Sequence, residues 1–176
     1  MSAQNKTTAL LRQQFKQGHE FLEGTMQRVT SEMAHWPPPG KAQPLGANYA
    51  HVLISEDFLV NGLLKGAAPL LASTQAGKVG VSELPPQAPP WNEWAGRVQV
   101  DVEALRSYAQ AVYEATDGYV ASLSDEDLDR PLDLSAIGFG QQTLGFMLSI
   151  LVFNVHTHTG EIACLKGLQG QQGYPF

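Results

Sequence analysis

Apolar side chains recur every three or four residues over four stretches of this chain, and breaks rich in proline and glycine separate the stretches. This spacing is typical of a helix that buries one face. The pattern predicts helices over residues 7–34, 46–65, 91–123 and 143–168. Four long amphipathic helices around a single core predict an all-α fold, a four-helix bundle. No alternation of apolar and polar residues is strong enough to indicate a sheet.

Proline, glycine and short polar residues mark where the predicted helices end. The first helix stops at residues 35–40, because proline lacks the N–H group and disfavours helix in the residue before it. Residues 67–90 form a long Pro/Gly-rich loop between the second and third helices, and connections of this length are typically functional or mobile. Residues 124–127 are expected to cap one short extra turn, and residues 131–140 to be irregular or weakly extended. Thr143 is a suitable N-cap for the last helix.

The composition narrows the class of protein. A length of 176 residues predicts a single domain over residues 1–176. The net charge of −6 argues against nucleic acid or an anionic membrane as the main partner. The most apolar stretch, residues 144–153, is too short to span a bilayer. The single cysteine, Cys164, excludes an internal disulfide and is expected to be small, buried and inert. These features together predict a cytoplasmic protein.

Two polar residues stand where the apolar stripe of the last predicted helix would place core side chains. The stripe that contains Met147 and Leu151 continues through Asn154 and His158. A buried polar group costs about 1–3 kcal/mol unless it is paired, so both side chains need partners there. His156 lies two residues from His158, about 200° around the helix, and is expected to point away from it.

A third polar residue, His51, lies on an apolar arc of the helix predicted over residues 46–65. If the two helices are neighbours, His51 meets His158 and Asn154, and two imidazoles, an amide oxygen and water would form an open divalent-metal site. Glu161 lies near the same face as a further ligand, an acceptor for an imidazole N–H, or a surface residue. The alternative is that these side chains are satisfied by hydrogen bonds within the core.

Other candidate residues carry weaker signals. Glu32 and His35 have the spacing of a di-iron ligand pair, but a ferritin-like centre needs a second such pair, and the chain has none. His19 is expected to be partly exposed and structural. Trp91 and Trp94 flank the Pro-rich loop, where they would anchor helix ends or line the mouth of a pocket.

Two short motifs, taken in order, carry a resemblance that covers essentially the whole chain. The first is Ala50-His51-Val52 with Glu56-Asp57 downstream, and the second is His158-Thr159-Gly160-Glu161-Ile162-Ala163. In this order and spacing they resemble the DinB-like/YfiT-like bundle superfamily of bacteria.

The resemblance implies a metal site. In that family a histidine on the second helix and a His-x-x-x-His pair on the fourth bind a divalent metal, usually Ni or Zn. Position by position these ligands fall on His51, Asn154 and His158, so that Asn154 stands where the third imidazole would be. Some relatives use a low-molecular-weight thiol, and relatives form homodimers.

Two functions follow as expectations. The first is a metal-dependent thiol transferase, isomerase or hydrolase that acts on a small molecule, in which Glu161 is the catalytic group that orients His158 or carries a proton. The second is a non-catalytic bundle of the same fold that has lost the metal and serves as a dimeric binding or interaction module.

Overall fold

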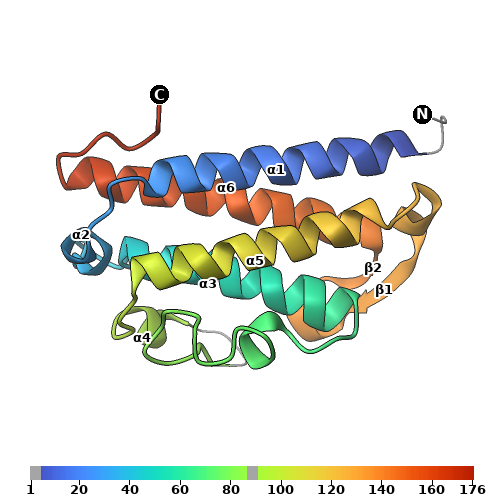
Figure 1. Ribbon diagram of the computed structural model, residues 1–176, viewed down its shortest axis with the longest axis horizontal. Coiled ribbons are helices and arrows are strands. Elements are labelled where there is room, and N and C mark those ends of the chain that lie inside the picture. Colours follow the sequence, from blue (N-terminus) through green and yellow to red (C-terminus); the bar gives the residue numbers. More distant parts are fainter. Residues whose placement is uncertain (1–4, 87–90) are drawn as a thin grey trace.

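The computed structural model describes residues 5–86 and 91–176, and most of these residues are helical. The long helical segments lie side by side (Figure 1). They are α1 (Lys6–Met26), α3 (Leu45–Asp57) with its wider-turned continuation η2 (Phe58–Leu64), α5 (Val102–Ala121) and α6 (Leu144–Leu168). Helices α1 and α3 each pack against both α5 and α6. The predicted helical architecture is therefore confirmed.

Shorter elements lie at the two ends of this bundle and along its α3 side (Figure 1). They are α2 (Ser31–His35), η3 (Leu70–Ala72), α4 (Asn92–Ala95), η4 (Glu126–Asp129), β1 (Pro131–Leu134), η5 (Ser135–Ile137) and β2 (Gly140–Thr143). Strands β1 and β2 form an antiparallel hairpin in which Pro131 lies opposite Thr143. The expectation that the chain contains no sheet is wrong here, because strands of four residues are too short to display a clear alternation.

The first predicted helix is two helices. Helix α1 ends at Met26, and Arg28 takes a positive φ of 61°. Thr30 then begins α2, because its hydroxyl accepts the N–H of Met33 at 3.2 Å. An N-cap of this kind satisfies a donor that a continuous helix would satisfy with a carbonyl. The apolar spacing continues through the break, so periodicity alone does not reveal it.

The third predicted helix is also interrupted. The short helix α4 ends at Ala95, and α5 begins only at Val102. Between them Val100 forms an antiparallel bridge with Val81, which ties the long connection to the bundle. The carboxylate of Asp101 then caps α5. The last predicted helix, by contrast, begins where expected, at the N-cap Thr143.

The long connection is partly ordered by a buried carboxylate. Asp57, at the end of α3, accepts the backbone N–H groups of Leu70 and Leu71 at 2.8 and 2.9 Å. These bonds hold η3 against the bundle. Residues 87–90, the end of the predicted loop, lie outside the described residues.

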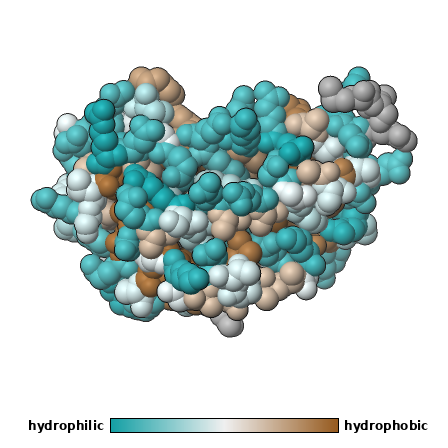
Figure 2. Space-filling view, viewed as in Figure 1, coloured by the Kyte–Doolittle hydropathy of each residue, from teal (hydrophilic) through white to brown (hydrophobic). Residues whose placement is uncertain are grey.

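On the face drawn in Figure 2, the described residues form no continuous apolar band. The face drawn in Figure 2 is mainly hydrophilic, with apolar side chains scattered among polar ones. No helix in the described ranges combines the length and the apolar character needed to cross a bilayer. The apolar residues 144–153 instead begin α6, where Leu144, Met147 and Leu151 are buried in the core.

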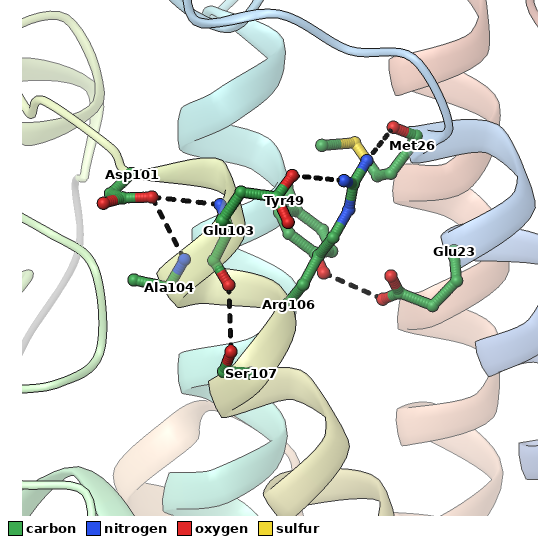
Figure 3. A network of polar contacts seen from close by, with 8 residues as sticks. All are labelled: Glu23, Met26, Tyr49, Asp101, Glu103, Ala104, Arg106 and Ser107. Atoms are coloured by element: carbon green, nitrogen blue, oxygen red, sulfur yellow. Dashed lines mark hydrogen bonds and ion pairs between the residues drawn. The ribbon is translucent and has the colours of Figure 1, made fainter.

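Polar side chains also join the helices inside the bundle. Glu23 of α1 accepts the hydroxyl of Tyr49 from α3 at 2.8 Å, and the same oxygen accepts the hydroxyl of Tyr113 from α5. Nearby, Arg106 donates to the carbonyl of Met26 at 2.7 Å. Figure 3 shows Arg106 and Tyr49 reaching from their own helices toward the end of α1. These contacts fix α1 relative to α3 and α5.

Candidate functional site

The two histidines singled out from the sequence meet between helices α3 and α6. The ring centroids of His51 and His158 are 4.8 Å apart, and the rings are inclined at 75°. The expected convergence of these two imidazoles is therefore present. Both side chains are half-buried, so they are accessible to a ligand without being loose on the surface.

The hydrogen bonds of the two rings identify which nitrogens are available. Nδ1 of His158 lies 2.6 Å from Oε2 of Glu161, one turn along the same helix. A carboxylate has no proton to donate, so Nδ1 carries the proton in this contact. Nδ1 of His51 has a long contact of 3.5 Å with Oγ of Ser55, also on its own helix. Among the described residues, neither Nε2 has a hydrogen-bond partner.

This geometry fits two imidazole ligands of one ion. Two rings that bind a metal through nitrogen at about 2.0–2.1 Å, at angles between square and tetrahedral, would have centroids roughly 4.5–5 Å apart. A carboxylate on the other ring nitrogen, as Glu161 provides for His158, is the usual companion of a metal-binding histidine. However, the described part of the chain contains no group of three His, Cys, Asp or Glu residues that could hold a metal.

Asn154 is not among the residues that line the pocket with the two histidines. The buried face of α6 passes through Val155 and Thr159, whereas Asn154 and His158 are only half-buried. The expectation that Asn154 and His158 lie on the buried face is therefore wrong. The buried positions come one residue later in the sequence, which corresponds to a rotation of about 100° around the helix axis. Thr159 is tolerated in the core because its hydroxyl donates to the carbonyl of Val155 at 2.7 Å. A spacing of three and four residues from Leu151 fits a stripe through residues 154 and 158 and also a stripe through residues 155 and 159. The spacing therefore does not show which of the two stripes is buried.

The two histidines line a pocket of about 450 Å³ at the end of the bundle that carries α2 and α4. This is within the usual size of small-molecule sites. Trp91 and Trp94 form part of its wall, as the sequence suggested. The lining residues are Lys41, Ala42, Gln43, Ala47, Asn48, His51, Trp91, Asn92, Trp94, Ala95, His158, Glu161, Cys164, Leu165 and Leu168.

Some of these residues had not been singled out from the sequence as pocket residues. Asn48 precedes His51 by three residues, and Leu165 follows His158 by seven. Helical spacing from the two histidines would have found both, since such positions share a face. Lys41 lies in the segment before α3 and carries no such signal.

The environment of His51 favours its neutral form. Burial, and secondarily the facing His158, lower the pKa of His51 from 6.5 to about 4. At neutral pH the His51 ring is therefore uncharged and keeps a lone pair for a metal or a hydrogen bond. The ring also packs edge-on against Trp91, with centroids 4.5 Å apart.

The two tryptophans of the pocket differ in their hydrogen bonds. The indole N–H of Trp94 donates to the carbonyl of Glu83 at 3.0 Å. The indole nitrogen of Trp91 is buried and has no partner among the described residues. A buried donor without an acceptor is uncommon in folded proteins.

Two residues of α6 near the site behave differently from each other. His156 is exposed on the side of α6 that faces α1, where it lies near Gly18, so it points away from His158 as expected. The expectation that Cys164 is buried is wrong. Its side chain is exposed and lines the pocket, because positions 158, 161, 164 and 165 follow one face of the helix.

His19 and His35 have structural partners. His19 is buried rather than partly exposed, which corrects the expectation, and its Nε2 lies 3.0 Å from Oε2 of Glu56. His35 accepts the backbone N–H of Val100 at 2.9 Å, which ties α2 to the segment before α5.

The comparisons with known proteins agree with this architecture. A family model of the DinB superfamily matches residues 14–162. The chain belongs to the DinB superfamily. The matched segment of this DinB superfamily member includes His51, Asn154, His158 and Glu161.

A solved structure has the same fold as this DinB superfamily chain. It is the crystal structure of a conserved protein from Enterococcus faecalis, which superimposes with a TM-score of 0.76 at 20% sequence identity. The match covers 94% of this chain and 96% of the other. At this identity the likeness shows the fold alone. A search of curated proteins finds no match.

Proposed function

We propose that this DinB superfamily protein binds a divalent metal ion, Ni or Zn, between His51 and His158, and that it acts on a small molecule in the adjoining pocket. The reaction would be a thiol transfer, an isomerisation or a hydrolysis, and a low-molecular-weight thiol is the expected co-substrate. The observation that supports the proposal is the pair of imidazoles 4.8 Å apart at the wall of a pocket of about 450 Å³.

The chain's own residues prepare this position. Glu161 holds Nδ1 of His158 and so leaves Nε2 to face a ligand. His51 is neutral at physiological pH because burial lowers its pKa to about 4. A bound divalent ion would supply Lewis-acid chemistry here. Asn154 stays a predicted ligand that lies away from the pocket lining, so water or the substrate would fill the remaining coordination positions.

The test is a titration of chelator-treated protein with Zn²⁺ and Ni²⁺, followed by calorimetry. We expect one ion per chain, and we expect His51→Ala and His158→Ala to abolish tight binding. Glu161→Gln should weaken binding by about 10–100-fold, because it loosens the orientation of His158. His156→Ala is the matched control, since this histidine lies on the same helix and faces α1. Equal binding by all four variants would reject the metal site.

One observation favours the second function, a non-catalytic binding or interaction module. The described residues provide two imidazoles and no third His, Cys, Asp or Glu for an ion. A module that has lost its metal would bind small molecules equally well before and after chelation. It would also form the homodimer expected from its relatives, which sedimentation velocity would detect. Loss of ligand binding on chelation would argue against this function.

A further inference from the structure

The outward side of α6 carries no charge. Helix α6 packs mainly against α1 and α3, and the residues on its opposite side are exposed or half-buried. We call this side the outer face of α6, and at about 100° per residue it comprises Phe146, Ser149, Ile150, Phe153, Thr157, Gly160, Cys164, Gly167 and Leu168. A surface helix normally presents charged and polar residues to solvent, whereas a helix that is apolar all round is normally covered. The outer face therefore has the character of a covered surface.

Large apolar side chains of the outer face project into solvent. Phe153 is 66% exposed and Leu168 is 57% exposed, and Phe146 and Ile150 are half-buried. Apolar side chains that gather at one exposed place mark an interaction site. The charges favour a second copy of the chain as the occupant. Each chain has a net charge of −6, so two copies avoid like-charge contact by meeting through an uncharged face.

The sizes of the side chains make the outer face complementary to itself. Its N-terminal half holds the large residues and its C-terminal half the small ones: Phe146, Ile150 and Phe153 against Gly160, Cys164 and Gly167. In an antiparallel pair centred between residues 156 and 157, position 146 lies opposite 167, position 153 opposite 160, and position 150 beside 164. One register therefore places every large residue against a small one, as a two-fold symmetric interface requires. A parallel pair would place large against large.

The outer face needs its flanks to reach the size of a stable interface. From residue 146 to residue 168 it is about 33 Å long and one helix, about 10–12 Å, wide. A stable dimer buries about 800 Å² per partner, more than such a strip supplies alone. Phe139 of the hairpin extends it, since its ring lies 5.6 Å from that of Phe146. Tyr174 extends it near the other end, where its hydroxyl lies 3.5 Å from the position of a Cβ at Gly160.

We infer that two copies of this chain pair antiparallel through the outer face of α6. Ile150 and Phe146 of one copy then lie beside Cys164 and Leu168 of the other. Cys164 and Leu168 also line the pocket, so each copy helps to close the pocket of its partner. The role of this closure in binding a small molecule rests on the proposed function, whereas the pairing itself does not require the metal.

The first test measures the pairing by sedimentation equilibrium of the chelator-treated full chain. We expect a monomer–dimer equilibrium. Phe153→Asp should raise the dissociation constant of the dimer at least about tenfold, because it removes a large apolar contact and places a charge at the interface. Phe58→Asp is the matched control, since Phe58 is 55% exposed and lies on η2, and it should leave the dissociation constant unchanged.

The second test fills the small half of the face. A Cβ at Gly167 of α6 or at Gly118 of α5 would meet no heavy atom of the described residues within 4 Å, so a side chain at either position fits the monomer. Gly167→Gln places a long side chain opposite Phe146 of the other copy and should weaken the dimer about tenfold. Gly118→Gln is the matched control and should not change the dissociation constant. Circular dichroism verifies that each variant is folded.

The third test fixes the register by disulfide formation under mild oxidation. Positions 150 and 164 are about 21 Å apart along one helix, so they cannot form a disulfide within a chain. Ile150→Cys should cross-link to Cys164 of the other copy and give a covalent dimer. The wild type should not cross-link, because the two Cys164 residues of the antiparallel pair lie about 22 Å apart along the helix axis. Ile150→Cys combined with Cys164→Ser should fail to cross-link for the same reason.

Three results would overturn the inference. They are a wild type that sediments as a monomer at about 100 μM, a dimer that Phe153→Asp does not weaken, and a wild type that cross-links through Cys164 alone, which would indicate parallel helices. The outcome is independent of the metal titration. A monomer that binds one metal ion leaves the proposed function and rejects the pairing, whereas a dimer with the expected cross-links that binds no metal leaves the pairing and rejects the metal site.

Discussion

Two histidines of this bundle, His19 of α1 and His51 of α3, have very different surroundings. His19 is buried, its Nε2 lies 3.0 Å from Glu56, and the other oxygen of Glu56 accepts the hydroxyl of Thr116 at 2.6 Å. His51 is half-buried beside the indole of Trp91. Among the described residues, Nε2 of His51 and Nε1 of Trp91 have no partner.

The difference separates polar groups that hold the fold from polar groups that are available to a ligand. Glu23 resembles Glu56 in joining helices, because one of its oxygens accepts the hydroxyls of both Tyr49 and Tyr113. Burial and the nearby Glu23 raise the pKa of Tyr49, so its hydroxyl remains a donor at all ordinary pH values. Such networks join helices, and their hydrogen bonds hold the fold together. In the pocket, by contrast, the Nε2 atoms of His51 and His158 have no hydrogen-bond partner among the described residues.

The largest effect on stability is expected from Glu56→Ala. The substitution leaves the His19 ring and the Thr116 hydroxyl buried without their acceptor, and breaking a buried pair of this kind costs roughly 3–5 kcal/mol. Urea denaturation followed by circular dichroism measures the loss.

The matched control is Glu161→Ala, which also removes a glutamate that contacts a histidine. The side chain of Glu161 is 51% exposed, so the loss of stability should be below about 1 kcal/mol. If the two variants lose the same stability, the division between a structural and an available region is wrong.

A smaller effect is expected from pH. In the unfolded chain His51 titrates near 6.5, whereas in the fold its pKa is about 4. Between these values the unfolded state binds more protons, so the free energy of unfolding of the metal-free protein falls as the pH decreases from 7 to 4. The contribution of His51 to this fall is about 3 kcal/mol. Chemical denaturation of the wild type and of His51→Gln across this range isolates it. Parallel curves for the two proteins would contradict the enclosed, neutral imidazole.

The sequence predicted the parts of this structure that repeat and missed those that depend on single contacts. The apolar period over four stretches was sufficient for the bundle, because each helix must bury a face. The breaks at Thr30 and Asp101 were missed, since each depends on one cap that the apolar spacing does not register. The pairing of His19 with Glu56 crosses 37 residues of sequence and leaves no local signal.

The two histidines of the candidate site could be predicted from the sequence, whereas the orientation of the residues around them could not. His51 and His158 were identified because each lies on the apolar side of a predicted helix and within one of the two short motifs of the family. Asn154 and Cys164 were placed wrongly because a rotation of one residue exchanges neighbouring faces of α6. The buried, unpartnered nitrogen of Trp91 depends on how the assembled fold packs around the ring, which no local pattern in the sequence indicates.

The smallest effect, and the sharpest test of the comparison, comes from replacing the indole N–H of each pocket tryptophan with sulfur. Benzothienylalanine keeps the shape of tryptophan and removes only the donor, so no cavity forms. At Trp94 the carbonyl of Glu83 loses its partner, and the protein should lose about 1 kcal/mol of stability. At Trp91 no bond is lost and a buried polar group disappears, so stability should be unchanged or slightly higher. Thermal denaturation of the two ligand-free proteins measures this. A loss at Trp91 as large as the loss at Trp94 would mean that its N–H is already satisfied, and the pocket would then be as closed as the region around Glu56.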